Sequence, residues 1–111
     1  DLWNDVSMTV MPIPSSPDPR QLEGAVAMFD ALSDLARLKT LLALPEAGSG
    51  VSALARAVGE KVTTVSARLH ILHAARLVVR ERKGKNVIYR LADDHVLTLV
   101  RNAVAQASEM R

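Results

Sequence analysis

Four polar side chains near the C-terminal end have the types and spacing of metal ligands. Asp93 and His95 are separated by one residue, and Gln106 and Glu109 follow in the same apolar-patterned segment. Carboxylate and imidazole groups are typical ligands of zinc and nickel. If this segment is a helix, the eleven residues from His95 to Gln106 span about 16 Å. One ion cannot bridge that span, so all four groups can meet only between two copies of the helix that pair antiparallel.

A simpler interpretation of these residues needs no metal. Asp93 would cap the helix, His95 would be a polar residue of the first turn, and Glu109 would be a solvated acid. The neutral Gln106 oxygen is also a weaker ligand for zinc or nickel than an imidazole. We favour a nickel or zinc site at Asp93, His95, Gln106 and Glu109, and the metal-free alternative stays open.

The positive charge of the chain is concentrated in one contiguous segment. Residues 51–91 hold nine basic and two acidic residues, a net charge of +7, whereas the whole chain carries only +2. Such a concentration predicts a surface that binds a polyanion. Aromatic residues make up only 3% of the chain, which argues against a base-stacking surface for RNA or single strands and favours double-stranded DNA.

Hydrophobic periodicity indicates the elements that must position these groups. Apolar residues at helical spacing predict helices over residues 20–32, 35–44, 52–58, 62–75 and 95–109. Runs rich in β-branched residues predict a hairpin of two strands, 77–82 and 86–91, around Gly84. Gly59 is placed to take the left-handed conformation that ends a helix. Four of the five prolines fall in residues 1–19, which we expect to be a flexible tail. Met8 and Met11 are candidates for the first residue of the natural protein.

This order predicts a mainly α-helical winged helix-turn-helix domain over residues 20–111, with the hairpin as its wing. Val65 and Leu69 would face the core, which leaves the other side of helix 62–75 for the major groove of DNA. The wing would lie on phosphates or in the minor groove, although a short charge run can also be a solvated turn. The predicted DNA contacts are Val62, Thr63, Ser66, Ala67, Arg68 and His70 in the helix and Arg80, Arg82, Lys83 and Lys85 in the wing.

Several other classes of protein are excluded or disfavoured. The absence of cysteine excludes disulfides, thiolate metal sites and cysteine nucleophiles. No apolar run is long enough to cross a membrane and no signal peptide is evident, so we expect a cytoplasmic protein. The adjacent carboxylates Asp93 and Asp94 lack the cleft and nucleophile of an enzyme site, so we predict no catalytic residues. His70 and His73 lie three residues apart and could chelate a metal, but DNA contact and packing or solvent exposure are the simpler roles.

Short motifs follow one another along residues 20–109 in an order that is typical of one bacterial family. They are Phe29-Asp-Ala-Leu-Ser-Asp34, Ala36-Arg-Leu38, Leu54-Ala-Arg-Ala-Val-Gly59, Thr63-Thr-Val-Ser66 with Leu69 and Leu72, Leu77-Val78, Gly84 and Tyr89-Arg-Leu91. With these motifs the chain resembles the ArsR/SmtB family of metal- and stress-responsive repressors. The resemblance implies a homodimeric winged-helix regulator that binds an imperfect palindrome in a double-stranded DNA operator.

The resemblance also implies how the last helix would be used. Some members of this family, including nickel-responsive ones, carry an intersubunit site that begins with Asp-x-His and ends with two later ligands. Asp93, His95 and Glu109 match that pattern, and Gln106 departs from it because a histidine is usual there. By family analogy, metal binding would release the protein from DNA.

Further departures concern the DNA-binding element. Lys61 stands where the family often has a capping serine, and Arg76 replaces a frequent glycine after the recognition helix. Val62 and Ala67 occupy positions that are usually polar. The operator sequence therefore cannot be transferred from relatives.

Two alternatives to a metal-controlled repressor remain open. The chain could be a family member with a degenerate metal site that answers to redox state, a small molecule or an accessory protein. It could also be a dimerisation module that has lost DNA binding.

Overall fold

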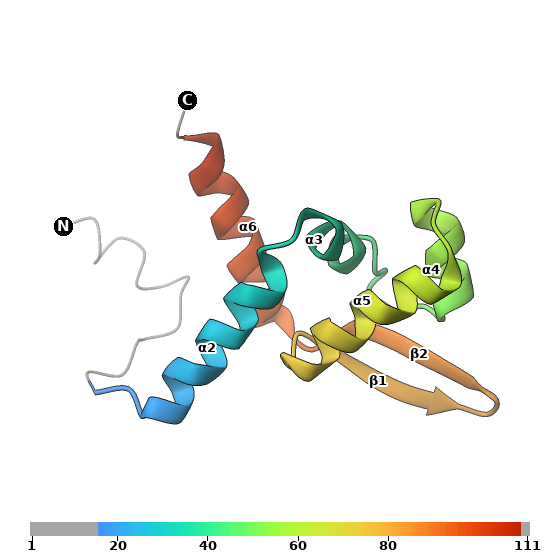
Figure 1. The fold of residues 1–111 in the computed structure, drawn as a ribbon, viewed down its shortest axis with the longest axis horizontal. Helices are drawn as coiled ribbons and strands as arrows, with labels where there is room; N and C mark the ends of the chain where they lie inside the picture. The colour runs from blue at the N-terminus through green and yellow to red at the C-terminus, as the bar shows by residue number, and fades with distance from the viewer. Residues whose placement is uncertain (1–15, 110–111) are drawn as a thin grey trace.

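The computed structural model describes residues 16–109, and this part of the chain forms five α-helices and one β-hairpin (Figure 1). The order and type of these elements confirm the predicted winged helix-turn-helix, and their bounds differ from the predicted ones by no more than two residues. Residues 1–15 of the predicted tail lie outside the described residues. The elements are α2 (Pro19–Leu32), α3 (Leu35–Leu42), α4 (Val51–Val58), α5 (Val62–Ala74), β1 (Val78–Lys83), β2 (Asn86–Leu91) and α6 (Asp94–Ser108).

Short polar side chains fix where most of the helices begin. Asp18 caps α2 by accepting a 2.8 Å hydrogen bond from the N–H of Arg20. Asp34 caps α3 in the same way by accepting from the N–H of Arg37 at 2.9 Å, and that bond is the main cause that lowers the pKa of this carboxyl. Gly59 has a φ of 72° at the end of α4, which confirms the left-handed C-cap. These signals are local, which is why the helix bounds could be predicted from the sequence.

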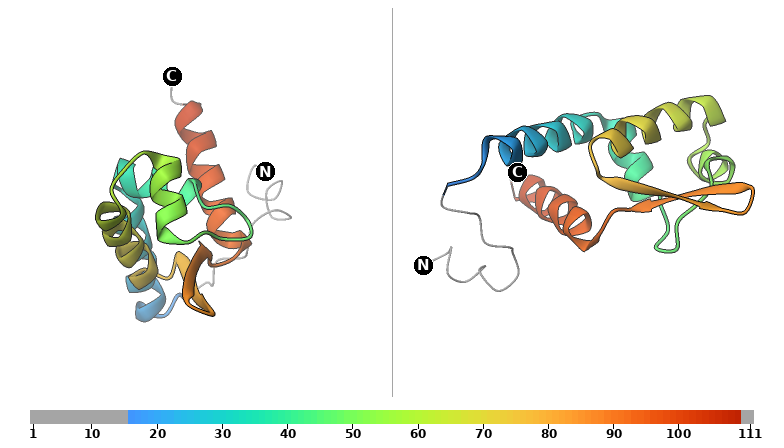
Figure 2. Two further views of the ribbon diagram at one scale, coloured as in Figure 1. Left: turned by 90° about the vertical axis from the view of Figure 1, so that its right-hand side faces the viewer. Right: turned by 90° about the horizontal axis from the view of Figure 1, so that it is seen from below.

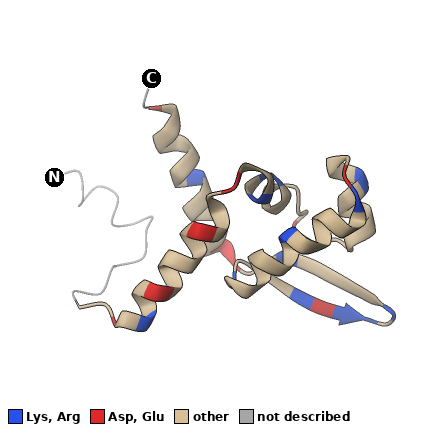
Figure 3. Ribbon diagram, viewed as in Figure 1, with Lys and Arg blue, Asp and Glu red and all other residues tan. Residues whose placement is uncertain are grey.

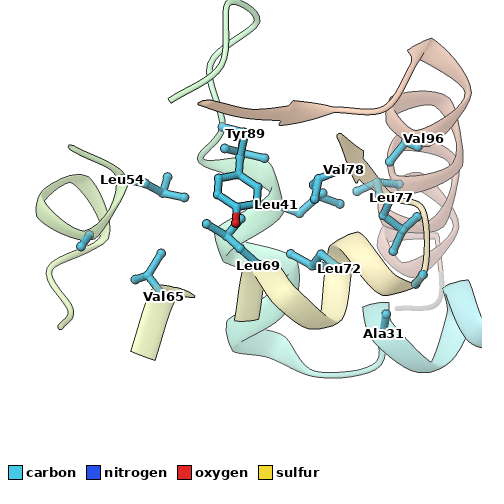
Figure 4. Close-up of a cluster of buried hydrophobic side chains, with 14 residues drawn as sticks. Ala31, Leu41, Leu54, Val65, Leu69, Leu72, Leu77, Val78, Tyr89 and Val96 are labelled. Carbon is cyan, nitrogen blue, oxygen red and sulfur yellow. The ribbon is translucent and has the colours of Figure 1, made fainter. Parts of the chain in front are cut away.

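The core lies between α3, α4, α5 and the base of the hairpin (Figure 4). In α5, Val65, Leu69 and Leu72 are fully buried, as their spacing of four and three residues predicts. Figure 4 shows Leu69 and Leu72 facing Leu41 and Val78 across this core. Burying one such leucine contributes about 1.5–3 kcal/mol, so this contact surface holds α5 at a fixed angle to the rest of the domain.

The hairpin is tied to the helices at its base and extends away from them at its tip. Its strands pair antiparallel, from Val78 opposite Leu91 to Lys83 opposite Asn86. Ser49 in the loop between α3 and α4 forms two 2.8 Å backbone hydrogen bonds with Tyr89 in β2. They make an isolated antiparallel β-bridge that joins this loop to the hairpin. Figure 2 shows the hairpin projecting from the end of the molecule opposite to α2 and α6.

Candidate nucleic-acid interface

One side of α5 is exposed and carries short polar side chains. With Val65, Leu69 and Leu72 turned into the core, Thr63, Ser66, Ala67 and His70 share the other side of the helix. Val62 lies at the first position of the helix. Val62, Thr63, Ala67 and His70 are exposed and Ser66 is half-buried, so the structure brings five of the six predicted helix residues to one accessible surface.

Arg68, the sixth predicted helix residue, lies elsewhere. Two residues along a helix correspond to about 200° of rotation, so Arg68 points to the opposite side from Ser66 and His70. Its guanidinium forms an ion pair with Glu60, in the turn before α5, and a long hydrogen bond of 3.5 Å to the hydroxyl of Thr40 in α3. The two-residue offset from Ser66 was visible in the sequence and is the signal that could have indicated this direction.

The hairpin presents a row of accessible cations. Arg80, Arg82, Lys83 and Lys85 are exposed, and within residues 16–109 none of the four takes part in an ion pair. Figure 3 shows this positive charge along β1 and at the tip of the hairpin, whereas acidic segments mark α2 and the start of α6. The arrangement confirms that the charge asymmetry of the sequence is also an asymmetry in space.

The strand register sorts the hairpin side chains into two faces. Arg80 lies opposite Tyr89 and Arg82 opposite Val87, so both arginines continue the face whose base, at Val78 and Tyr89, packs into the core. Glu81 lies on the other face, where it forms an ion pair with Arg90 at 3.4 Å. Arg80 and Arg82 therefore stand on the side of the hairpin that faces the helices.

The predicted metal ligands fall into two separate groups within one chain. Asp93 caps α6 by accepting a 3.2 Å bond from the N–H of Val96, and its Oδ1 lies 3.7 Å from Nδ1 of His95. Both side chains are more than half exposed. Gln106 and Glu109 are exposed at the other end of the same helix. Across residues 16–109, no three His, Cys, Asp or Glu side chains gather closely enough to hold an ion, and the pair His70 and His73 is likewise without a third ligand.

The helices α2 and α6 expose an apolar surface beside a hollow. Val26 and Phe29 of α2 and Val104 of α6 are all more than half exposed. The hollow between the two helices has a volume of about 330 Å³, and its lining is almost entirely apolar, with Phe29 and Leu32 on one side and Leu99 and Val104 on the other. Contiguous exposed apolar surface of this kind marks an interaction site.

No helix in residues 16–109 combines the length and the apolar character that a membrane crossing requires.

No protein-family model matches the chain, but individual relatives do. The HTH-type transcriptional repressor SmtB of Mycobacterium tuberculosis is 40% identical over 95 residues, which cover 85% of this chain and 70% of that protein. The HTH-type transcriptional regulator NmtR of the same bacterium is 34% identical over 98 residues, 87% of this chain and 82% of NmtR. These relatives are regulators of transcription and not enzymes.

Solved structures match the fold over most of its length. The homodimeric winged helix-turn-helix DNA-binding domain of Mb0332 from Mycobacterium bovis, described as a possible ArsR-family regulator, superposes with a TM-score of 0.77 at 31% identity. The match covers 90% of this chain and 93% of that one. The solution structure of apo-NmtR superposes with a TM-score of 0.67 at 32% identity and covers 91% of this chain and 86% of that one. The chain therefore belongs to the ArsR/SmtB family of winged helix-turn-helix transcriptional regulators.

Proposed function

We propose that this protein is a homodimeric repressor of transcription that reads double-stranded DNA with α5 and holds the DNA backbone with the hairpin. The observation that carries the proposal is the exposed polar side of α5 beside the cations of the hairpin. Short side chains let a helix approach base edges closely. Thr63, Ser66 and His70 would donate to or accept from base edges, and the methyl groups of Val62 and Ala67 would contact thymine.

The hairpin cations supply affinity more than sequence preference. Arg80, Arg82, Lys83 and Lys85 are exposed on a hairpin that projects beyond the helices, where they would contact phosphates or enter the minor groove. Contacts to phosphates are nearly independent of sequence and depend strongly on salt. The two elements therefore have separable roles in binding.

Fluorescence anisotropy tests these roles. The probe is a labelled duplex from the region upstream of the protein's own gene, and the reference is a shuffled duplex of the same composition. The Thr63→Ala/Ser66→Ala variant should lose the preference for the upstream duplex, because it removes base contacts. The Arg82→Ala/Lys83→Ala variant should weaken binding to both duplexes by a similar factor, because it removes phosphate contacts.

The matched control for both variants is Arg101→Ala. Arg101 is exposed on α6, a helix that contributes none of the proposed DNA contacts, so its removal should leave the affinity unchanged. Equal binding of both duplexes by the wild type would contradict the proposal. Failure of the wild type to bind either duplex at micromolar concentration would favour a dimerisation module that has lost DNA binding.

The apolar surface of α2 and α6 is the proposed dimer interface. Val26, Phe29 and Val104 are exposed in a single chain, and a two-fold axis beside α6 would bury them against their counterparts. The same axis would bring the Asp93 end of one α6 to the Glu109 end of the other. Dimerisation and the completion of a metal site would then be one event.

We further propose that a divalent nickel or zinc ion controls the dimer at this position. The supporting observation is the pair Asp93 and His95, which are 3.7 Å apart, exposed, and of the right chemistry. These two would hold the ion together with Glu109 and, more weakly, Gln106 of the other copy. The dimer shapes with and without the ion would differ in the spacing of the two α5 helices, which changes the affinity for DNA. By family analogy, the metal-bound shape is the one that leaves DNA.

Calorimetric titration with zinc and with nickel tests the metal proposal. The His95→Ala variant should lose the binding heat of the wild type, whereas the control His73→Ala should retain it, because His73 is exposed on a different helix. Equal heats for wild type and His95→Ala would reject the site. In that case a redox signal, a small molecule or an accessory protein would be the remaining source of control, with DNA binding by α5 unaffected.

A further inference from the structure

The start of α5 lacks the cap that three other helices of the domain possess. Asp18, Asp34 and Asp93 each accept a hydrogen bond from the first turn of the helix that follows. Lys61 occupies the equivalent position before α5 and forms no capping bond, because an ammonium group has no acceptor. Any side-chain contact that holds the N-terminal end of this helix must therefore come from a residue other than Lys61.

Arg68 supplies such a contact from within α5. Its guanidinium pairs with Glu60, which lies one residue before Lys61, and reaches the hydroxyl of Thr40 in α3. Thr40 is buried, and the Arg68 side chain is only 19% exposed. One side chain thus joins the turn before α5, the second turn of α5 itself, and α3.

We propose that Arg68 is a positioning residue that fixes the N-terminal end of α5 against α3, and that it does not contact DNA. This inference rests on the DNA-binding function proposed above. To reach a phosphate, Arg68 would have to leave Glu60 and Thr40 and turn to the other side of α5.

The salt dependence of DNA affinity separates positioning from contact. Each phosphate neutralised by the protein contributes about −0.9 to the slope of the logarithm of affinity against the logarithm of salt concentration. A positioning residue changes the affinity but not the number of phosphate contacts. Removing Arg68 should therefore weaken binding at every salt concentration while the slope stays as in the wild type.

The experiment is an anisotropy titration of the upstream duplex over a series of KCl concentrations. Arg68→Ala should bind about tenfold more weakly than the wild type, a loss of about 1.4 kcal/mol, with an unchanged slope. The matched control is Lys83→Ala in the hairpin, whose slope should be shallower by about 1.8, because the dimer loses one phosphate contact in each protomer. A slope for Arg68→Ala that is shallower by the same amount as for Lys83→Ala would overturn the inference.

A second measurement does not depend on DNA. Urea unfolding of Arg68→Met, Glu60→Gln and the double variant measures the coupling of the two side chains. Each single variant should lower the urea midpoint. The midpoint of the double variant should be no lower than that of the less stable single variant, because either single substitution already breaks the ion pair. Additive losses would overturn the inference. If the wild type fails to bind the duplex, the proposed function is wrong, whereas this cycle still tests the ion pair.

Charge reversal gives an independent check on DNA binding. Arg68→Glu alone should bind the duplex far more weakly than the wild type, because it places two carboxylates together. The double variant Glu60→Arg/Arg68→Glu should recover most of the lost affinity, because it restores the ion pair. A double variant as weak as Arg68→Glu would contradict the assigned role.

Discussion

Nε of Arg37 in α3 donates a 2.8 Å hydrogen bond to the carbonyl oxygen of Ala31 in the last turn of α2. Nη2 of the same guanidinium donates to the carbonyl oxygen of Asp30 at 3.2 Å. The last turn of a helix carries carbonyl groups without intrahelical partners and a partial negative charge. Arg37 supplies a partner for Ala31 and adds its positive charge beside Asp30, whose carbonyl already accepts from Ser33. Because α2 belongs to the proposed dimer interface and α3 packs on α5, Arg37 connects the proposed dimer interface to the proposed DNA-binding helix.

Removal of the Arg37 side chain should destabilise the domain. Hydrogen bonds from a charged group contribute about 1.5–3 kcal/mol, so Arg37→Ala should lower the free energy of unfolding by roughly that amount in urea titrations. The control is Lys39→Ala, an exposed residue of the same helix, which should change the stability by less than about 0.5 kcal/mol. Equal effects of the two substitutions would show that the bonds to α2 contribute nothing.

Arg76 holds a backbone conformation that favours glycine. Its φ is 63°, and it is the sole non-glycine residue with a positive φ among those described. An L-residue in this region carries about 1–2 kcal/mol of strain. The variant Arg76→Gly should therefore be more stable than Arg76→Ala by about 1 kcal/mol in thermal or urea unfolding. Both variants remove the guanidinium, so their difference isolates the backbone, and an Ala variant as stable as the Gly variant would refute the strain.

The Asp34 cap should make stability depend on acid pH. The N–H of Arg37 lowers the pKa of Asp34 below its ordinary value of 3.8. A carboxyl with a lowered pKa stabilises the folded state fully well above its ordinary pKa, and that contribution is lost as the pH falls through the lowered one. Asp34→Asn keeps the capping oxygen but does not titrate. Urea midpoints measured from about pH 6 to pH 2 should therefore fall less steeply for this variant than for the wild type, and parallel curves would contradict the assignment.

The dimer interface predicts a specific change of association state. Val104 is 51% exposed in the single chain and lines the hollow between α2 and α6. Val104→Glu would bury a charge in the interface and should shift sedimentation equilibrium towards the monomer. Leu35→Glu is the matched control, because Leu35 is 67% exposed and lines a different hollow, beside Val58 and Glu60. A dimer weakened equally by both substitutions, or by neither, would place the interface elsewhere.

The sequence predicted the elements well because their signals are local. The inward side of α5 followed from the spacing of Val65, Leu69 and Leu72, and the end of α4 followed from Gly59. Asp34 and Asp93 marked helix starts by residue type alone. Each of these predictions depends on interactions within a few residues, which periodicity and capping preferences capture.

The directions of individual side chains and their contacts between different helices were harder to predict. The charge of Arg68 and its place in α5 predict a DNA contact, whereas the structure directs its guanidinium to Glu60 and Thr40. The link from Arg37 to α2 requires the angle between two helices, which no local pattern encodes. A metal site that Gln106 and Glu109 share with His95 is likewise hard to predict from one sequence, because it requires a second chain.

Hydroxyl-radical footprinting of the upstream duplex tests the central claim most directly, namely that a symmetric dimer places two α5 helices in successive major grooves. The wild type should protect two tracts related by a dyad, with centres about one helical turn, or roughly 10 base pairs, apart. The Arg82→Ala/Lys83→Ala variant should lose the outer edges of both tracts, where the hairpins lie. A single protected tract, or no protection at concentrations at which the protein is dimeric, would contradict the account.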